Sequence, residues 1–269
     1  MSALAALIFV FDASAQPRRP VNDKVAPLSK REAAERWAEF SSAKLADYCM
    51  SFSISHNPRR GESVFYDGLI FGSERDGAAL TRIRIKKSGD PSAKFADFIL
   101  KNTPRGSEIF TAENGKWKKI PESEWFKPML GGLVYSPFDI LMPYRFWEAR
   151  YDSAGRIGQA VYFFALAAPE GFKGGVSKVV LALTRDFNAP AQTEIFGGDG
   201  KLVKTVSLGS VKKVDGLWIM RESSARDELS RDKDILRFRA AKLRAALPAS
   251  VFSTDAAPTA PETPELKAL

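Results

Sequence analysis

Short turns that contain glycine recur along the chain and separate runs of residues typical of β-strands. The turns are Tyr66-Asp67-Gly68, Asp76-Gly77, Asn114-Gly115, Gly197-Gly198-Asp199-Gly200 and Asp215-Gly216. Asn-Gly and Asp-Gly accept the positive φ angles that tight hairpins need. The strand-like runs are Glu108–Ala112, Lys116–Ile120, Gln159–Ala167, Ser177–Arg185, Gln192–Phe196, Leu202–Leu208, Val211–Val214 and Leu217–Glu222. Because no helix of about 12 residues separates consecutive hairpins, the pattern predicts an antiparallel sheet and not a doubly wound one.

The periodicity of the strands indicates which of their faces are buried. Residues 81–86 alternate, so Ile83 and Ile85 are expected to face the core, and Arg82 and Arg84 to face solvent. The runs 161–166 and 179–183 are apolar on both faces. Such a sheet must cover both faces. It can do so as a sandwich, or as a curved sheet whose concave face is closed by helices, and residue pattern alone favours neither.

Two segments are candidates for that cover. Residues 29–47 predict an amphipathic helix of about four turns, because Ser29 and Glu32 form a capping box and Trp37 and Phe40 share one face. Residues 121–150 are rich in aromatic side chains and interrupted by prolines and glycines. This composition predicts short helices or turns packed on the sheet. Residues 230–247 are compatible in part with a helix, although 235–238 also read as a strand end.

The two ends of the chain differ from its middle. An apolar run over residues 3–11 is followed by Ala13-Ser14-Ala15, which predicts a secretory signal peptide over residues 1–15. The run is shorter than the about 20 residues that span a bilayer. Residues 16–28 read as a linker, 29–247 as a single domain and 248–269, rich in proline and alanine, as a disordered tail. Export predicts a periplasmic location.

Composition argues against catalysis and against nucleic acid as a partner. The chain has one cysteine, Cys49, and one histidine, His56, so an intramolecular disulfide, a cysteine-rich metal site and a histidine-cluster metal site are excluded. No nucleophile elbow, phosphate-binding loop or zinc-protease motif occurs. The net charge is +8, or +9 without residues 1–15, and basic and acidic residues are mixed along 226–244. We therefore expect no enzyme activity, no cofactor, no metal and at most a weak, salt-dependent attraction to anionic membranes.

The order of motifs in the second half resembles that of the LolA-like periplasmic carriers, the outer-membrane lipoprotein-sorting proteins. The resemblance covers about residues 108–240. It rests on Val179–Arg185, Ala189-Pro190, Glu194–Thr205, Val211–Met220, Arg231-Asp232-Lys233 and Leu236-Arg237-Phe238, and upstream on Trp117, Glu124–Pro128 and Ser136–Leu141. Residues 48–107 match poorly, and the aromatic segment 121–150 departs from the standard carrier.

The resemblance implies a mainly β fold with some α-helix: a curved antiparallel half-barrel with a helical lid over an apolar concavity. It implies a carrier or chaperone that binds the acyl chains of a lipoprotein or lipid and delivers it toward the outer membrane, together with an inner-membrane transporter and an outer-membrane acceptor. An alternative is an envelope-stress sensor on the same fold that binds a membrane protein partner. The candidate lipid-binding residues are Trp117, Trp125, Phe126, Leu130, Tyr135, Phe138, Leu141, Phe146, Trp147 and Phe163.

Overall fold

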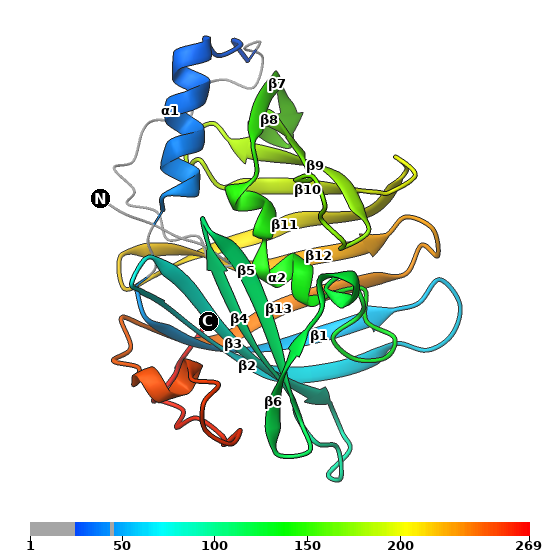
Figure 1. Ribbon diagram of the computed structural model, residues 1–269, viewed down its shortest axis with the longest axis vertical. Helices are drawn as coiled ribbons and strands as arrows, with labels where there is room; N and C mark the ends of the chain where they lie inside the picture. The colour runs from blue at the N-terminus through cyan, green and yellow to red at the C-terminus, as the bar shows by residue number, and fades with distance from the viewer. Residues whose placement is uncertain (1–24, 44–45) are drawn as a thin grey trace.

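The computed structural model describes residues 25–43 and 46–269. The predicted signal peptide and most of the predicted linker lie outside the described residues. The described chain forms one large, curved antiparallel sheet of 14 strands with a few short helices (Figure 1). The strands are β1 (Tyr48–Asn57), β2 (Val64–Arg75), β3 (Ala78–Lys87), β4 (Ala96–Thr103), β5 (Gly106–Glu113), β6 (Lys116–Ile120), β7 (Ala149–Ile157), β8 (Gln159–Ala167), β9 (Val176–Thr184), β10 (Pro190–Gly197), β11 (Leu202–Val214), β12 (Leu217–Asp227), β13 (Lys233–Leu243) and β14 (Lys267–Ala268).

The sheet consists of two meanders joined at their centre. The strand order is β6-β5-β4-β3-β2-β1-β13-β12-β11-β10-β9-β8-β7, so β6 and β7 are the two edges and β1 pairs with β13 in the middle. Register shifts occur between Ser51 and Phe52 and between Leu208 and Val211, and such bulges bend a strand. The predicted half-barrel of antiparallel strands is confirmed.

The predicted hairpins are confirmed at four positions and wrong at one. The turn at residues 197–200 joins the antiparallel strands β10 and β11. Asp76, Asn114 and Asp215 all adopt positive φ angles of about 50° at hairpin turns (52°, 51° and 48°). Gly68, in contrast, lies inside β2. Its role is close packing, because a Cβ atom there would lie 2.3 Å from the ring of Phe52 on β1. Residues 230–247 contain β13 and no helix.

The helix α1 (Lys30–Ser41) begins with the predicted capping box between Ser29 and Glu32. It ends at Ser41 with Ser42 as its C-cap, earlier than the predicted end near residue 47. Trp37 packs on Phe164 of β8, with 5.4 Å between the ring centroids. The helix therefore covers one end of the concave face, as expected. No described helix is long and apolar enough to cross a membrane.

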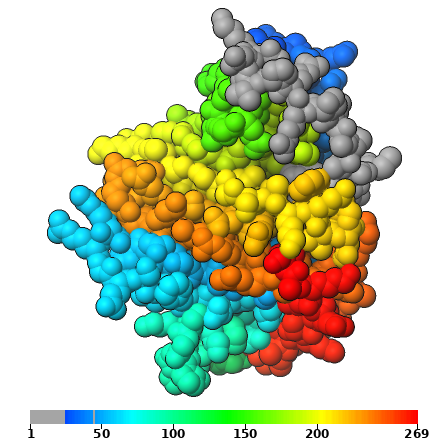
Figure 2. Space-filling model, turned by 180° about the vertical axis from the view of Figure 1, so that it is seen from behind, coloured from blue at the N-terminus to red at the C-terminus, as the bar shows by residue number. Residues whose placement is uncertain are grey.

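Residues 248–269 are packed on the outer, convex side and differ from the disordered tail that the sequence predicts. This C-terminal segment contains η3 (Ala249–Phe252) and β14, which pairs with β13. Val251 and Phe252 are buried against Cys49 and Phe71. The outer face of β1 and β2 is apolar there and needs a cover, which the segment provides. In Figure 2, the view from behind, it is visible in red.

The segment also changes the environment of the basic run on β3. Ile83 and Ile85 face the core as predicted. Arg82 faces outward but is only 3% exposed, so the expected solvated position is wrong for this residue. Its guanidinium pairs with Asp97 and donates to the carbonyl oxygens of Val251 and Thr259. The C-terminal segment thus excludes solvent from a residue that strand alternation alone places in water.

Candidate functional site

The concave face of the sheet is filled by residues 121–147, which we call the plug (Figure 1). The plug contains η1 (Glu122–Glu124), α2 (Pro137–Leu141) and η2 (Pro143–Phe146), which confirms the predicted short helices. Its aromatic side chains contact one another and Phe172 from the β8–β9 loop. Phe172 lies 5.2 Å from Trp147 and 6.2 Å from Phe138, measured between ring centroids. The apolar interior is therefore closed by the chain itself.

Local sequence explains the shape of the plug. Ser136 and Asp139 form a capping box that starts α2, and Pro137 occupies its first turn, where the missing N–H costs nothing. Met142 adopts a left-handed conformation with φ of 50° between α2 and η2. Met142 and the Pro143 that follows it separate the two short helices.

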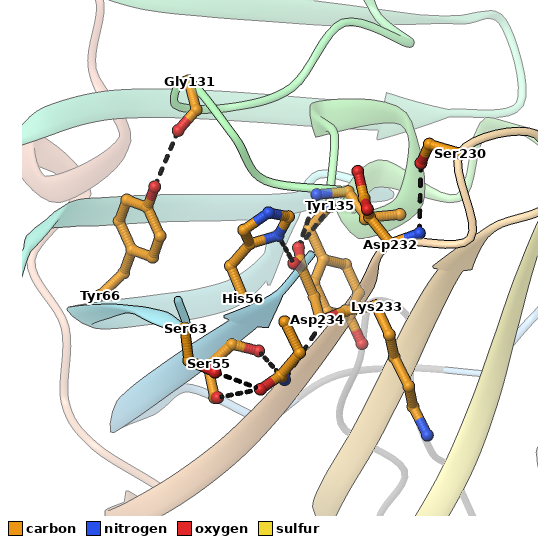
Figure 3. Close-up of polar contacts among 12 residues, drawn as sticks. Ser55, His56, Ser63, Tyr66, Gly131, Tyr135, Ser230, Asp232, Lys233 and Asp234 are labelled. Atoms are coloured by element: carbon orange, nitrogen blue, oxygen red, sulfur yellow. Dashed lines mark hydrogen bonds and ion pairs between the residues drawn. The ribbon is translucent and has the colours of Figure 1, made fainter. Parts of the chain in front are cut away.

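The carboxylate of Asp234 on β13 binds backbone N–H groups of the plug. Its Oδ2 atom accepts hydrogen bonds from the backbone N–H groups of Val134 and Tyr135, at 2.7 and 2.9 Å. Its Oδ1 atom lies 2.8 Å from Nδ1 of His56 on β1 (Figure 3). Burial raises the pKa of Asp234, although these hydrogen bonds oppose the shift. Nearby, the Tyr66 hydroxyl donates to the carbonyl oxygen of Gly131 at 2.7 Å (Figure 3).

A second buried charge pair connects the plug to β11. Lys204 Nζ lies 2.8 Å from Asp139 Oδ2 and 3.2 Å from Ser136 Oγ. Both charged side chains are almost fully buried, at 4% and 0% exposure. The ammonium group also lies 4.1 Å from the centroid of the Phe126 ring. Because burial removes solvent from both charges, each depends on the other for its stability.

Further polar contacts come from two other strands. The Tyr135 hydroxyl lies 2.6 Å from Ser223 Oγ on β12. Asn102 on β4 donates to the carbonyl oxygens of Leu141 and Met142 at 2.7 and 3.2 Å. The plug is thus attached to strands on both halves of the sheet by hydrogen bonds at separate points, with apolar contact between them.

The structure brings most of the sequence-predicted residues together. Seven of them lie in or against the main core on the concave side: Trp125, Phe126, Leu130, Tyr135, Phe138, Leu141 and Trp147. Phe146 lines cavities at the rim. They fill the concavity in this structure and do not line an open one.

Two predicted residues lie on the outer face instead. Trp117 on β6 packs under the guanidinium of Arg82, 5.0 Å from it. Phe163 packs against a small outer cluster with Val161 and Ala182, because its neighbours in β8, Tyr162 and Phe164, take the inward positions. Both residues are apolar, as the prediction required, but alternation along the strand decides which face of the sheet a side chain occupies.

Sequence reasoning missed Phe172 and the polar residues that contact the plug from the inner face. Asp234 stands in phase with Leu236 and Phe238 on β13, and Lys204 stands in phase with Val206 and Leu208 on β11. A charge in phase with apolar residues on a strand is a signal of a buried partner. The partner itself, on a segment some 65 to 100 residues away, carries no such signal.

Two cavities of about 300 Å³ each open at the rim, next to the plug. Pro104 and Phe146 line both. One cavity also contains Trp125, Trp147 and Phe172, and the other contains Arg145 and Glu74. Among the described residues, no group of three or more His, Cys, Asp or Glu side chains is placed to hold a metal ion.

Comparison with known proteins places this architecture in one fold group. A family model described as an uncharacterized protein matches residues 148–256. No curated protein matches the sequence. An outer membrane lipoprotein-sorting protein domain from Vibrio parahaemolyticus superposes with a TM-score of 0.69 at 15% identity, covering 82% of this chain and 94% of that one.

Two other solved structures give the same result. A DUF1329 family protein from Desulfovibrio piger has a TM-score of 0.69 at 11% identity, covering 82% of this chain and 95% of its own. A LolA superfamily protein from Nitrosomonas europaea has a TM-score of 0.63 at 15% identity, with 85% and 99% covered. The chain therefore has the LolA-like fold, and the resemblance found in the sequence is confirmed at the level of the fold.

Proposed function

We propose that this protein is a periplasmic carrier that binds the acyl chains of a lipoprotein or lipid in the concavity occupied by the plug, and delivers them toward the outer membrane without catalysis. The observation that carries the proposal is the plug. The apolar inner face of a half-barrel is covered by one short aromatic segment that is held by separate polar contacts. Such a segment can leave the sheet while the sheet stays paired.

The plug and an acyl chain would compete for the same apolar inner face, which a reversible carrier requires. An acyl chain gains about 0.8 kcal/mol per buried methylene, or roughly 11 kcal/mol for a chain of about 14 methylenes. Each hydrogen bond between plug and sheet contributes about 0.5 to 1.5 kcal/mol net. The plug also buries apolar side chains of its own against the inner face, so an acyl chain would exchange one apolar cover for another. The plug would cover the face again after the cargo leaves. No external energy source is needed for this exchange.

The predicted signal peptide and the lipoprotein-sorting protein of Vibrio parahaemolyticus with the same fold support the location and the class of cargo. A passive carrier between two membranes would take its cargo from an inner-membrane transporter and give it to an outer-membrane acceptor. The net positive charge of the chain adds a weak attraction to anionic membrane surfaces.

Native mass spectrometry on the mature protein, isolated from its own periplasm and followed by lipid extraction, tests the proposal directly. A bound acylated species of defined mass is the expected result. A clean apo mass, together with no uptake of a diacylated lipopeptide or of palmitate, would overturn it.

Variants of the plug contacts test whether acyl chains enter where the plug lies. Tyr66→Phe and Ser223→Ala each remove one contact between sheet and plug. Without one of these contacts the plug leaves the sheet more easily, so a larger fraction of the molecules can bind an acyl chain. Each variant should therefore tighten the apparent affinity for a fluorescent fatty acid by about three- to tenfold. Ser73→Ala is the matched control, since Ser73 is fully buried and bonded to Asp47 away from the plug. Equal affinities in all three variants would argue against entry at the plug.

A further inference from the structure

Arg145, on η2 of the plug, is a buried cation with few partners. The residue is only 3% exposed. Its terminal nitrogen donates to the carbonyl oxygen of Ala43, which follows α1. Its Nε atom is buried and has no hydrogen-bond partner among the described residues. A guanidinium carries five N–H donors, and the only acceptor for them among the described residues is this one neutral carbonyl.

Arg82 shows what a satisfied buried arginine looks like in the same protein. It has the same 3% exposure, but both oxygens of Asp97 accept from it, at 2.9 and 2.6 Å, and two backbone carbonyls accept further bonds. Buried arginines are normally paired in this bidentate way. Among the described residues, no carboxylate forms an ion pair of this kind with Arg145, so the two arginines differ in the acceptors that surround them.

Arg145 also lines a cavity of about 300 Å³. The cavity lies between the end of α1, the β2–β3 hairpin and the plug, and its other lining residues are Ser41, Ser42, Ala43, Glu74, Gly77, Ala79, Pro104 and Phe146. Burial lowers the pKa of Arg145 to about 10, and the nearby Glu74 opposes this shift. The guanidinium is therefore still charged at neutral pH.

We infer that this cavity is a binding site for an oxyanion, a carboxylate or a phosphate, which Arg145 binds where it lines the cavity. The oxyanion accepts hydrogen bonds from Arg145, as the carboxylate of Asp97 accepts them from Arg82. A free anion and the anionic head group of a lipid present the same chemistry. The cavity borders the place proposed for acyl chains, because Arg145 and Phe146 belong to the plug. Binding of free phosphate tests the oxyanion site whether or not the acyl-carrier proposal holds.

Glu74 gives the site a second testable property. Its negative charge supports the charged form of Arg145 in the empty cavity, but it repels an anion that enters. Glu74→Gln should therefore tighten oxyanion binding several-fold. A purely structural role for Arg145, as an anchor for the chain after α1, predicts no such effect.

Isothermal titration of the full chain tests the inference with three probes: inorganic phosphate, oleate and oleyl alcohol. Oleate and oleyl alcohol have hydrocarbon tails of the same length and differ in the head group, a carboxylate in one and a hydroxyl in the other. A preference for oleate therefore reports on an oxyanion site. We expect oleate to bind at least about tenfold more tightly than oleyl alcohol, or phosphate to bind at millimolar concentration. Arg145→Gln should abolish either effect, and Glu74→Gln should increase it. Arg105→Gln is the control, because Arg105 is exposed and lines the neighbouring cavity.

Each outcome is informative. Phosphate binding that depends on Arg145, without a preference for oleate, supports the site and identifies its ligand as a free anion. A preference for oleate without phosphate binding supports it as a head-group site. If wild-type protein neither binds phosphate nor prefers oleate, or if Arg145→Gln keeps the preference, the inference is wrong. Should Arg145→Gln fail to fold, the wild-type comparison and the Glu74→Gln variant still decide the question.

Discussion

Asp234 illustrates at the scale of one residue how the inner face combines charge with burial. Its carboxylate accepts two backbone N–H bonds from the plug and lies beside His56, yet its pKa is raised because burial outweighs those bonds. An acid with a raised pKa binds its proton more tightly in the folded chain than in the unfolded chain. Its contribution to stability is therefore greatest below its ordinary pKa of 3.8 and falls as the pH rises through the raised value.

Asp234→Asn should remove this part of the pH dependence. Asparagine keeps one carbonyl oxygen for the plug but has no proton to release. The advantage of wild type over Asp234→Asn should therefore be largest below the ordinary pKa of 3.8 and should shrink as the pH rises through the raised pKa. Urea unfolding of both proteins across that range measures it. A difference that grows with pH would mean that the hydrogen bonds from Val134, Tyr135 and His56 outweigh burial.

The buried ion pair between Lys204 and Asp139 is expected to be energetically coupled. Lys204→Met leaves the buried Asp139 charge without its partner and should destabilise the protein by about 3 to 5 kcal/mol. Lys204→Met combined with Asp139→Asn removes both charges and keeps an acceptor for Ser136, so it should cost less than the Lys204→Met change alone. A double-mutant cycle measured by urea unfolding gives the coupling. Additivity of the two changes within about 0.5 kcal/mol would show that the pair is not coupled.

At the scale of elements, the C-terminal segment is a structural part of the sheet. Its composition of proline and alanine predicts disorder, but Phe252 fills an apolar gap on the outer face beside Cys49. Burial raises the pKa of the Cys49 thiol to about 12, which keeps it unreactive in the native protein.

Phe252→Ala should therefore destabilise the protein by about 3 to 5 kcal/mol and increase the reaction rate of Cys49 with a thiol reagent. Denaturant unfolding and thiol labelling measure the two effects. Thr259→Ala is the control, because only the backbone of Thr259 contacts Arg82 and its side chain is exposed. Wild-type labelling and stability in Phe252→Ala would show that the segment is dispensable.

Local signals in the sequence predict elements where a single residue or a short period decides the structure. The residues 116–120 and 159–167 are strands with the predicted bounds, because alternation and flanking turns define them. The same reasoning wrongly predicts a turn at Gly68. A glycine in a turn and a glycine that packs beneath an aromatic ring cannot be told apart from the local sequence. The end of α1 was missed for a related reason, because no glycine or proline marks it.

At the scale of the whole molecule, the pairings that define the site are long-range. β1 pairs with β13 about 180 residues away, and Asp234 contacts the plug about 100 residues away. Such contacts depend on how the sheet curves, which no local period encodes. The half-barrel could be predicted from the resemblance to known carriers, and a cover for its concave face from the aromatic segment 121–150. The polar contacts that hold this cover could not be predicted.

The core joins the two halves of the chain, so we expect them to fold together. The family model covers residues 148–256, which contain β7 to β13. The inner face of these strands is covered by the plug, and β13 is paired with β1, both of which lie before residue 148. A fragment of residues 148–269 alone would expose that apolar face and the free edge of β13.

We therefore expect the isolated fragment 148–269 to bind a hydrophobic dye and to lack a cooperative unfolding transition, because its core is incomplete. Adding a separately produced fragment of residues 25–147 should restore both a cooperative transition and the near-ultraviolet circular dichroism of the packed aromatic residues. If fragment 148–269 unfolds cooperatively by itself, then β7 to β13 form an independent unit. The plug would in that case be a cover added to a folded half-sheet, and its removal by a ligand would leave the second half of the protein intact.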